Sequence, residues 1–87
     1  MGNHYPKHPR TIEELALELK KVVDDHRNHI ISDETLEDVI HYWSANEGDK
    51  LFDDEGNNIR STIQFRIGKR RVALIKKILD GFPRRII

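Results

Sequence analysis

The chain has 87 residues, no cysteine, and 15 Lys/Arg balanced by 15 Asp/Glu, a formal net charge of zero. This length allows one domain, and a chain so short buries only about 60–65% of its unfolded surface, so we expect oligomerisation to supplement its stability. The lack of cysteine excludes disulfides and thiolate catalysis and favours a reducing compartment. The apolar runs fall short of the roughly 20 residues that span a bilayer, so we expect a cytoplasmic protein with no membrane partner.

The neutral total conceals two halves of opposite charge. Residues 1–59 carry six Lys/Arg and fourteen Asp/Glu, a formal charge of −8, and residues 60–87 carry nine Lys/Arg and one acid, a formal charge of +8. The two halves can neutralise each other, within one chain or between copies. The function depends on whether some cations of the second half are left over for a ligand.

The first ten residues, MGNHYPKHPR, predict an extended N-terminal arm. Pro6 and Pro9 fix their own φ angles and disfavour helix at the residues before them. The arm places Tyr5 close in sequence to Lys7 and Arg10. An aromatic ring with neighbouring cations suits stacking on a nucleobase and neutralising its phosphate. The alternative is an arm that packs Tyr5 on a neighbouring part of the protein.

The rest of the chain predicts an all-α fold, with one helical domain at residues 11–82 and a short tail at 83–87. A Thr-x-x-Glu capping box begins at Thr11, and apolar residues follow it at helical spacing. Together these signals predict a first helix from about 12 to 27.

Two further helices complete a predicted three-helix domain. Ser32 is the expected N-cap of a second helix, from about 33 to 47, with acids in its first turn. A second capping box begins at Ser61, and a Gly-Phe-Pro stop follows, so the third helix is expected from about 62 to 80. The Glu-Gly-Asn-Asn run between these two helices predicts a turn.

The third helix separates its charges from its apolar residues when it is drawn as a helical wheel. One arc carries the cations Arg66, Lys69, Arg70, Lys76 and Lys77. The apolar residues fill roughly 200°, more than the roughly 100° that one neighbouring surface needs. The excess indicates a second packing partner, as in a homo-oligomer. Gly68 lies in the apolar arc and allows close backbone approach. Arg71 also lies there, and its charge needs either a carboxylate from the first two helices or a ligand phosphate.

The basic third helix is the basis of the functional hypothesis. Arg and Lys are the usual protein partners of phosphate, so we expect non-catalytic binding of a small anionic nucleotide. No nucleophile–base–orienter set is visible, and the histidines lack a metal-site motif. We therefore expect neither an enzyme nor a bound metal or cofactor.

Two alternatives stay open. One is a DNA-binding regulator that uses the third helix, although the zero net charge and the acidic first two helices disfavour duplex nucleic acid as a partner. The other is a structural or protein-inhibiting oligomer, whose oppositely charged halves pair with each other.

The segments YPKHPRTIEEL, DKLFD and TIQFRIGKRRVALIKKIL together resemble a family of small proteins from Gram-positive bacteria and their phages. That resemblance covers nearly the whole chain and by itself implies no activity. The chain also looks similar to phage anti-CBASS sponge proteins, small oligomers that sequester cyclic nucleotide immune signals without cleaving them. This resemblance implies a tetramer in the host cytoplasm that binds a cyclic oligonucleotide between protomers, with its bases sandwiched by aromatics. The implied ligand-binding residues are Tyr5, Lys7, Arg10, Arg66, Lys69, Arg70 and Arg71.

Overall fold

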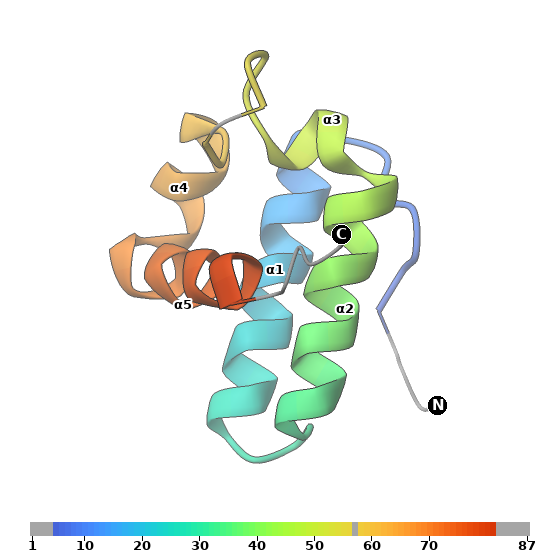
Figure 1. Cartoon of the computed structure of the whole chain (residues 1–87). Helices are drawn as coiled ribbons and strands as arrows, with labels where there is room; N and C mark the ends of the chain where they lie inside the picture. The colour runs from blue at the N-terminus through green and yellow to red at the C-terminus, as the bar shows by residue number, and fades with distance from the viewer. Residues whose placement is uncertain (1–4, 57, 82–87) are drawn as a thin grey trace.

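Two long antiparallel helices form the frame of the molecule, and two further helices pack on one side of them (Figure 1). The computed structural model describes residues 5–56 and 58–81. This part contains no strand, only a single bridge between Phe52 and Ile59, which confirms the all-α prediction. The tail at 83–87 lies outside the described residues. The helices are α1 (Ile12–Arg27), α2 (Asp33–Asn46), α3 (Gly48–Leu51), α4 (Ser61–Ile67) and α5 (Lys69–Gly81).

The predicted start signals of the first two helices are confirmed. Thr11 Oγ1 accepts a hydrogen bond from the Glu14 N–H at 3.0 Å, and Ser32 Oγ accepts one from the Thr35 N–H at 3.1 Å. The Glu14 carboxylate also accepts the Arg10 N–H at 2.8 Å, which ties the end of the arm to the first turn of α1. Because these caps satisfy backbone donors that a helix leaves open, both helices occupy the predicted ranges to within one residue.

The core lies where α1 and α2 face each other and meet α4 and α5. Each helix contributes apolar residues at helical spacing, and burial of each large aliphatic side chain stabilises the fold by about 1.5–3 kcal/mol. The most fully buried side chains are Trp43, Leu15, Leu19, Ile40, Leu51, Ile63, Ile67, Ile75 and Val22.

The single helix predicted at 62–80 is wrong, because the chain breaks at Gly68 into α4 and α5. Gly68 has φ 90° and ψ 162°, a backbone conformation open essentially only to glycine. Its N–H still donates to the Gln64 carbonyl at 2.9 Å and its carbonyl accepts the Val72 N–H at 3.1 Å, so it closes one helix and opens the next. The described residues therefore form five helices, including the short α3, in place of the predicted three.

The break also explains the wide apolar arc. Ile63 and Ile67 of α4 and Ile75 of α5 are buried in the same core, while Phe65 stays 90% exposed. Because α4 and α5 point in different directions, both can bury their apolar residues in the core of the same chain. A second copy is therefore not needed to cover these residues. The homo-oligomer remains a prediction without this support.

Replacing Gly68 by alanine is expected to lower the free energy of unfolding by about 1–3 kcal/mol, the cost of forcing an L-residue into this conformation. Nothing lies within 4 Å of an added Cβ there, so the cost is conformational and not a clash. Gly48→Ala is the matched control, because Gly48 has no positive φ and its added Cβ meets only Phe52 at an ordinary 3.7 Å. Urea unfolding followed by circular dichroism measures the free energy of unfolding of both variants. Equal stability of the two would contradict a special requirement for glycine at position 68.

The turn predicted between the second and third helices is present. Asp53 and Asn58 face each other across it, with the Asp53 N–H donating to the Asn58 carbonyl at 2.8 Å. Gly56 adopts a positive φ of 74°, as glycine does readily in tight turns. The predicted capping box at Ser61 is wrong, since Gln64 Nε2 donates instead to the Ile59 carbonyl at 2.6 Å.

Residues 5–10 of the N-terminal arm lie along the side of the α1–α2 hairpin away from α4 and α5 (Figure 1), and residues 1–4 lie outside the described residues. Tyr5 is only 7% exposed, and its hydroxyl donates to the carboxylate of Asp25. The Trp43 Nε1–H donates to the Pro6 carbonyl at 3.1 Å, and the Tyr5 ring meets Trp43 edge-on with centroids 6.5 Å apart. Desolvation of the phenol, with the Asp25 carboxylate beside it, raises the pKa of Tyr5. Tyr5 is thus a residue of the core, and it fixes the arm to the hairpin.

A buried carboxylate anchors the middle of the arm. Glu47, whose side chain is 6% exposed, accepts from Lys50 Nζ at 2.8 Å and from His8 Nδ1 at 2.6 Å. His8 Nε2 in turn lies 3.3 Å from the Tyr42 hydroxyl. The hydrogen bond from Lys50, and then that from His8, lower the pKa of Glu47 below its ordinary value.

Acid is expected to release this anchor. Because folding lowers the pKa of Glu47 from 4.5, its stabilising effect is fully present above that pH and is lost as the pH falls below it. Glu47→Gln should therefore be less stable than the wild type at pH 7, and the difference should narrow at pH 3. Urea titrations at the two pH values measure this difference, and a gap that does not depend on pH would rule out the carboxylate's role.

Candidate anion-binding groove

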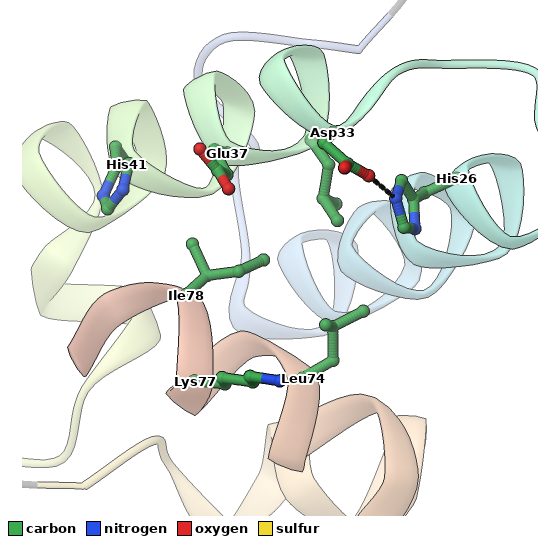
Figure 2. A pocket seen from close by; sticks show the side chains of 8 residues that line it. His26, Asp33, Glu37, His41, Leu74, Lys77 and Ile78 are labelled. Atoms are coloured by element: carbon green, nitrogen blue, oxygen red, sulfur yellow. Dashed lines mark hydrogen bonds and ion pairs between the residues drawn. The ribbon is translucent and has the colours of Figure 1, made fainter. Parts of the chain in front are cut away.

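Three adjoining hollows form a groove along α5, which we call the α5 groove. His26 of α1 and Leu74 of α5 line all three, with volumes of about 350, 790 and 160 Å³. The first lies between α1, α2 and α5 (Figure 2). The second surrounds the α1–α2 turn, and the third lies between α1 and the start of α5. A ligand in this groove would touch both ends of one face of α5.

The face of α5 in the groove carries two cations around an apolar residue. Arg70, Leu74 and Lys77 stand at i, i+4 and i+7, so they share one side of the helix. At 1.5 Å of rise per residue, the two cationic positions are about 10 Å apart along the axis. Arg27 lines the 160 Å³ hollow together with Arg70. The groove therefore offers a pair of guanidinium groups at one end and an ammonium group at the other.

The Arg71–Asp24 ion pair fixes α5 against α1 at this place. Arg71 Nε and Nη2 donate to the two carboxylate oxygens of Asp24 at 2.9 and 3.0 Å, and Nη1 donates to the Ile67 carbonyl at 2.9 Å. Of the two partners considered for Arg71, the structure shows the carboxylate from the first two helices. Asp24 compensates the charge of Arg71, and three of its five N–H groups are engaged, so Arg71 fixes the wall of the groove and is not counted among the cations left for a phosphate.

The other cations of α4 and α5 remain uncompensated. Within residues 5–56 and 58–81, Arg71 is the cation of these two helices that forms an ion pair, and the others are exposed to solvent. Each would gain Coulomb energy and charge-assisted hydrogen bonds from an anionic ligand. The exposed cations are Arg66, Lys69, Arg70, Lys76 and Lys77.

The three predicted arm residues do not meet the basic helices. The Tyr5 ring is buried, with Lys21 Nζ 5.7 Å from its centroid on one face and Trp43 against its edge, so a nucleobase has no access to it. Lys7 is exposed and lines a small hollow with Tyr42, and Arg10 is exposed at the start of α1. The arm lies across the hairpin from α5 (Figure 1), so one chain does not bring these residues to the α5 groove.

The four predicted helix residues are divided by the break at Gly68. Arg70 and Arg71 both line the third hollow of the α5 groove, where Arg71 is held in its ion pair with Asp24. Arg66 lines a shallow surface on α4 beside the exposed ring of Phe65, and Lys69 is exposed at the first residue of α5. Two of the predicted site residues, Arg70 and Arg71, therefore line the groove, and within the described residues Arg70 is the one of the two that forms no ion pair.

Three groove residues were not predicted: Arg27, Lys77 and Leu74. Arg27 stands three residues after Asp24, one turn along the same face of α1. If the pairing of Asp24 with Arg71 had been known, it would have placed Arg27 beside the start of α5. Lys77 lies in the same cationic arc of the helical wheel as Arg70, and Leu74 lies in the apolar arc beside it, but a wheel does not show which neighbour either arc faces.

Two histidines with different surroundings line the hollow between α1, α2 and α5 (Figure 2). His26 Nε2 lies 2.5 Å from Asp33 Oδ1. Burial lowers the pKa of His41 from its ordinary value, while the Glu37 and Asp38 carboxylates oppose that shift. Among residues 5–56 and 58–81, no cluster of His, Asp and Glu side chains has the arrangement of a metal site.

The fold and the groove define a small all-α protein with uncompensated cations beside an apolar hollow. The chain belongs to the CLB_0814 family, described as a conserved hypothetical protein, whose family model matches residues 6–80. No curated protein and no solved structure matches the chain. Across the two described stretches, no helix has both the length and the hydrophobicity that crossing a membrane requires.

Proposed function

We propose that the protein binds a small nucleotide with two phosphates in the α5 groove and holds it without a chemical step. A cyclic oligonucleotide is the form of ligand that we favour, and sequestration is the function. The observation that carries the proposal is the groove itself: Arg27 and Arg70 at one end, Lys77 at the other, and Leu74 between them. Two cationic ends suit two phosphates, and an apolar centre suits the flat face of a base.

The size and lining of the groove fit this class of ligand. The hollow in Figure 2 has a volume of about 350 Å³, within the range of small-molecule sites. Its apolar surface comes from Leu36, Leu74 and Ile78. In this proposal the base packs on that aliphatic surface and not on Tyr5. The resemblance to anti-CBASS sponge proteins supports a ligand that is captured and not cleaved.

Isothermal titration with cyclic di-AMP, cyclic di-GMP, a cyclic trinucleotide and inorganic phosphate tests the proposal. At least one cyclic nucleotide should give saturable heat and should bind at least about tenfold tighter than phosphate alone, because it engages both ends of the groove. Lys76→Ala should retain the affinity, since Lys76 is exposed on α5 but lines none of the three hollows. If none of these ligands binds, the proposal fails.

Titration of a short DNA duplex under the same conditions distinguishes a DNA-binding regulator from a protein that binds cyclic nucleotides. Duplex binding through a basic helix falls steeply with salt, because phosphate contacts release counterions. We expect weak duplex binding at 50 mM salt and none at 200 mM. Submicromolar duplex binding, together with no response to cyclic nucleotides, would favour a DNA-binding regulator instead.

A further inference from the structure

The hollow in Figure 2 contains a carboxylate that a purely phosphate-binding site would not need. Glu37 lies on α2, four residues after Asp33 and four before His41, so all three share one face of that helix. The Asp33 carboxylate contacts His26, whereas within the described residues Glu37 forms no hydrogen bond or ion pair. Its two oxygens are therefore free to accept hydrogen bonds from a ligand, while the charge of the carboxylate acts on His41 one turn along α2.

The charges around this hollow are separated. Figure 2 shows the Glu37 carboxylate over Ile78, and the Lys77 ammonium on the side of Leu74. Arg70 and Arg27 lie beyond Leu74 in the adjoining hollow. A ligand that fits this arrangement has its phosphates on the α5 side, toward Arg70 and Lys77, and its hydrogen-bond donors toward Glu37 on α2. Glu37 would repel a phosphate placed beside α2.

The donor pattern of the nucleobases then distinguishes among ligands. Guanine presents two adjacent N–H donors on one edge, at N1 and at the 2-amino group, and two parallel N–H groups match the two oxygens of a carboxylate. Adenine and cytosine each present an amino group beside a ring nitrogen that is an acceptor, which faces the carboxylate unfavourably. Uracil presents one N–H between two carbonyl oxygens.

We infer that Glu37 accepts the N1–H and 2-amino donors of guanine, so the groove prefers guanine nucleotides. This inference rests on the proposed function, because it names the base of the ligand whose phosphates Arg27 and Arg70 bind. The base lies on Leu74 and Ile78, and its edge faces α2. The assignment makes Glu37 a residue that determines specificity, and not one that contributes to the attraction of phosphate.

Affinities for cyclic di-GMP and cyclic di-AMP, measured by isothermal titration on the full chain, test the inference. The wild type should bind cyclic di-GMP about tenfold or more tightly than cyclic di-AMP, the discrimination expected of one bidentate pair. Cyclic di-IMP, which lacks the 2-amino group, should fall between them. Glu37→Gln should reduce the preference to within about threefold, because an amide offers one acceptor and one donor. It should not weaken cyclic di-AMP binding.

Glu34→Gln is the control, because Glu34 is exposed in the first turn of the same helix and lines none of the three hollows. It removes the same charge and should leave the preference unchanged. Equal affinity of the wild type for both ligands, or a preference that Glu37→Gln does not alter, would overturn the inference while leaving the proposed function in place. If neither ligand binds, the proposed function fails, and the inference fails with it.

Discussion

Replacing Arg27 and Arg70 together by alanine is expected to weaken cyclic dinucleotide binding by at least about a hundredfold. Each guanidinium would donate charge-assisted hydrogen bonds to the same phosphate, and each such contact is worth about 1.5–3 kcal/mol. Neither side chain forms an ion pair within residues 5–56 and 58–81, so the fold does not depend on them. The stability loss should stay below about 1 kcal/mol, the favourable effect of Arg27 at the C-terminus of α1.

The matched control is the double variant Lys20→Ala and Lys76→Ala. It also removes one cation from α1 and one from α5, both exposed and both outside the groove. Titration of the two double variants at the same ionic strength separates a defined site from general attraction between charges. If the control variant loses as much affinity as Arg27→Ala with Arg70→Ala, the ligand is attracted by net charge and the groove is not its site.

Trp43→Ala is expected to have the largest effect on stability, about 3–5 kcal/mol off the free energy of unfolding. Trp43 is 1% exposed at the centre of the core, and its indole N–H holds the Pro6 carbonyl of the arm. A chain of 87 residues has a total stability of about 4–13 kcal/mol. The variant is therefore expected to lose a large part of its stability or to unfold.

Trp43→Phe separates the two contributions of this residue. Phenylalanine keeps most of the apolar volume but removes the donor to Pro6, so we expect a loss of about 1–2 kcal/mol and earlier proteolysis at the arm. Leu17→Ala is the control, because Leu17 is 58% exposed on α1 and should change stability by less than about 0.5 kcal/mol. Urea unfolding measures all three variants. A cost below about 1 kcal/mol for Trp43→Ala would contradict the packing described.

The first residues of α1 and α2 could be predicted because the capping signals that mark them are local. Thr11 and Ser32 each cap a backbone donor three residues ahead, and no distant part of the chain is needed. The break at Gly68 could not be predicted in the same way. A glycine within a helix costs only about 1 kcal/mol, so a helical pattern continues across it. Whether the chain turns there is decided by packing of α4 against α1 and α5 against α2.

The position of the arm also depends on contacts that the sequence does not specify. The spacing of Pro6 and Pro9 predicts an extended segment but not the surface that it covers. Trp43 needs an acceptor for its indole N–H once it is buried, and the Pro6 carbonyl supplies it. Tyr5, next to Pro6, packs against Trp43 and is buried in the core. The ring that the sequence suggested for stacking on a base is therefore a packing residue.

The candidate site was predictable in its chemistry but not in its place. Arg71 required a carboxylate or a phosphate, and the first 59 residues hold fourteen acids. Only the folded chain selects Asp24, and that pairing sets Arg27 beside Arg70. The charge of residues 60–87 allows uncompensated cations on α4 and α5 but leaves open whether acids of the first half pair with them. The groove was not, because two helices and a turn build it together.

Backbone amide chemical shifts, recorded while a cyclic dinucleotide is added to the labelled protein, test the groove most directly. Binding in the α5 groove predicts that the largest changes occur at the C-terminal turn of α1 and along α5, at His26, Arg27, Leu74 and Lys77. Amides around Phe65 on α4 and Lys7 in the arm should stay unchanged. No response to saturating ligand, or changes confined to Phe65 or Lys7, would contradict nucleotide binding in this groove.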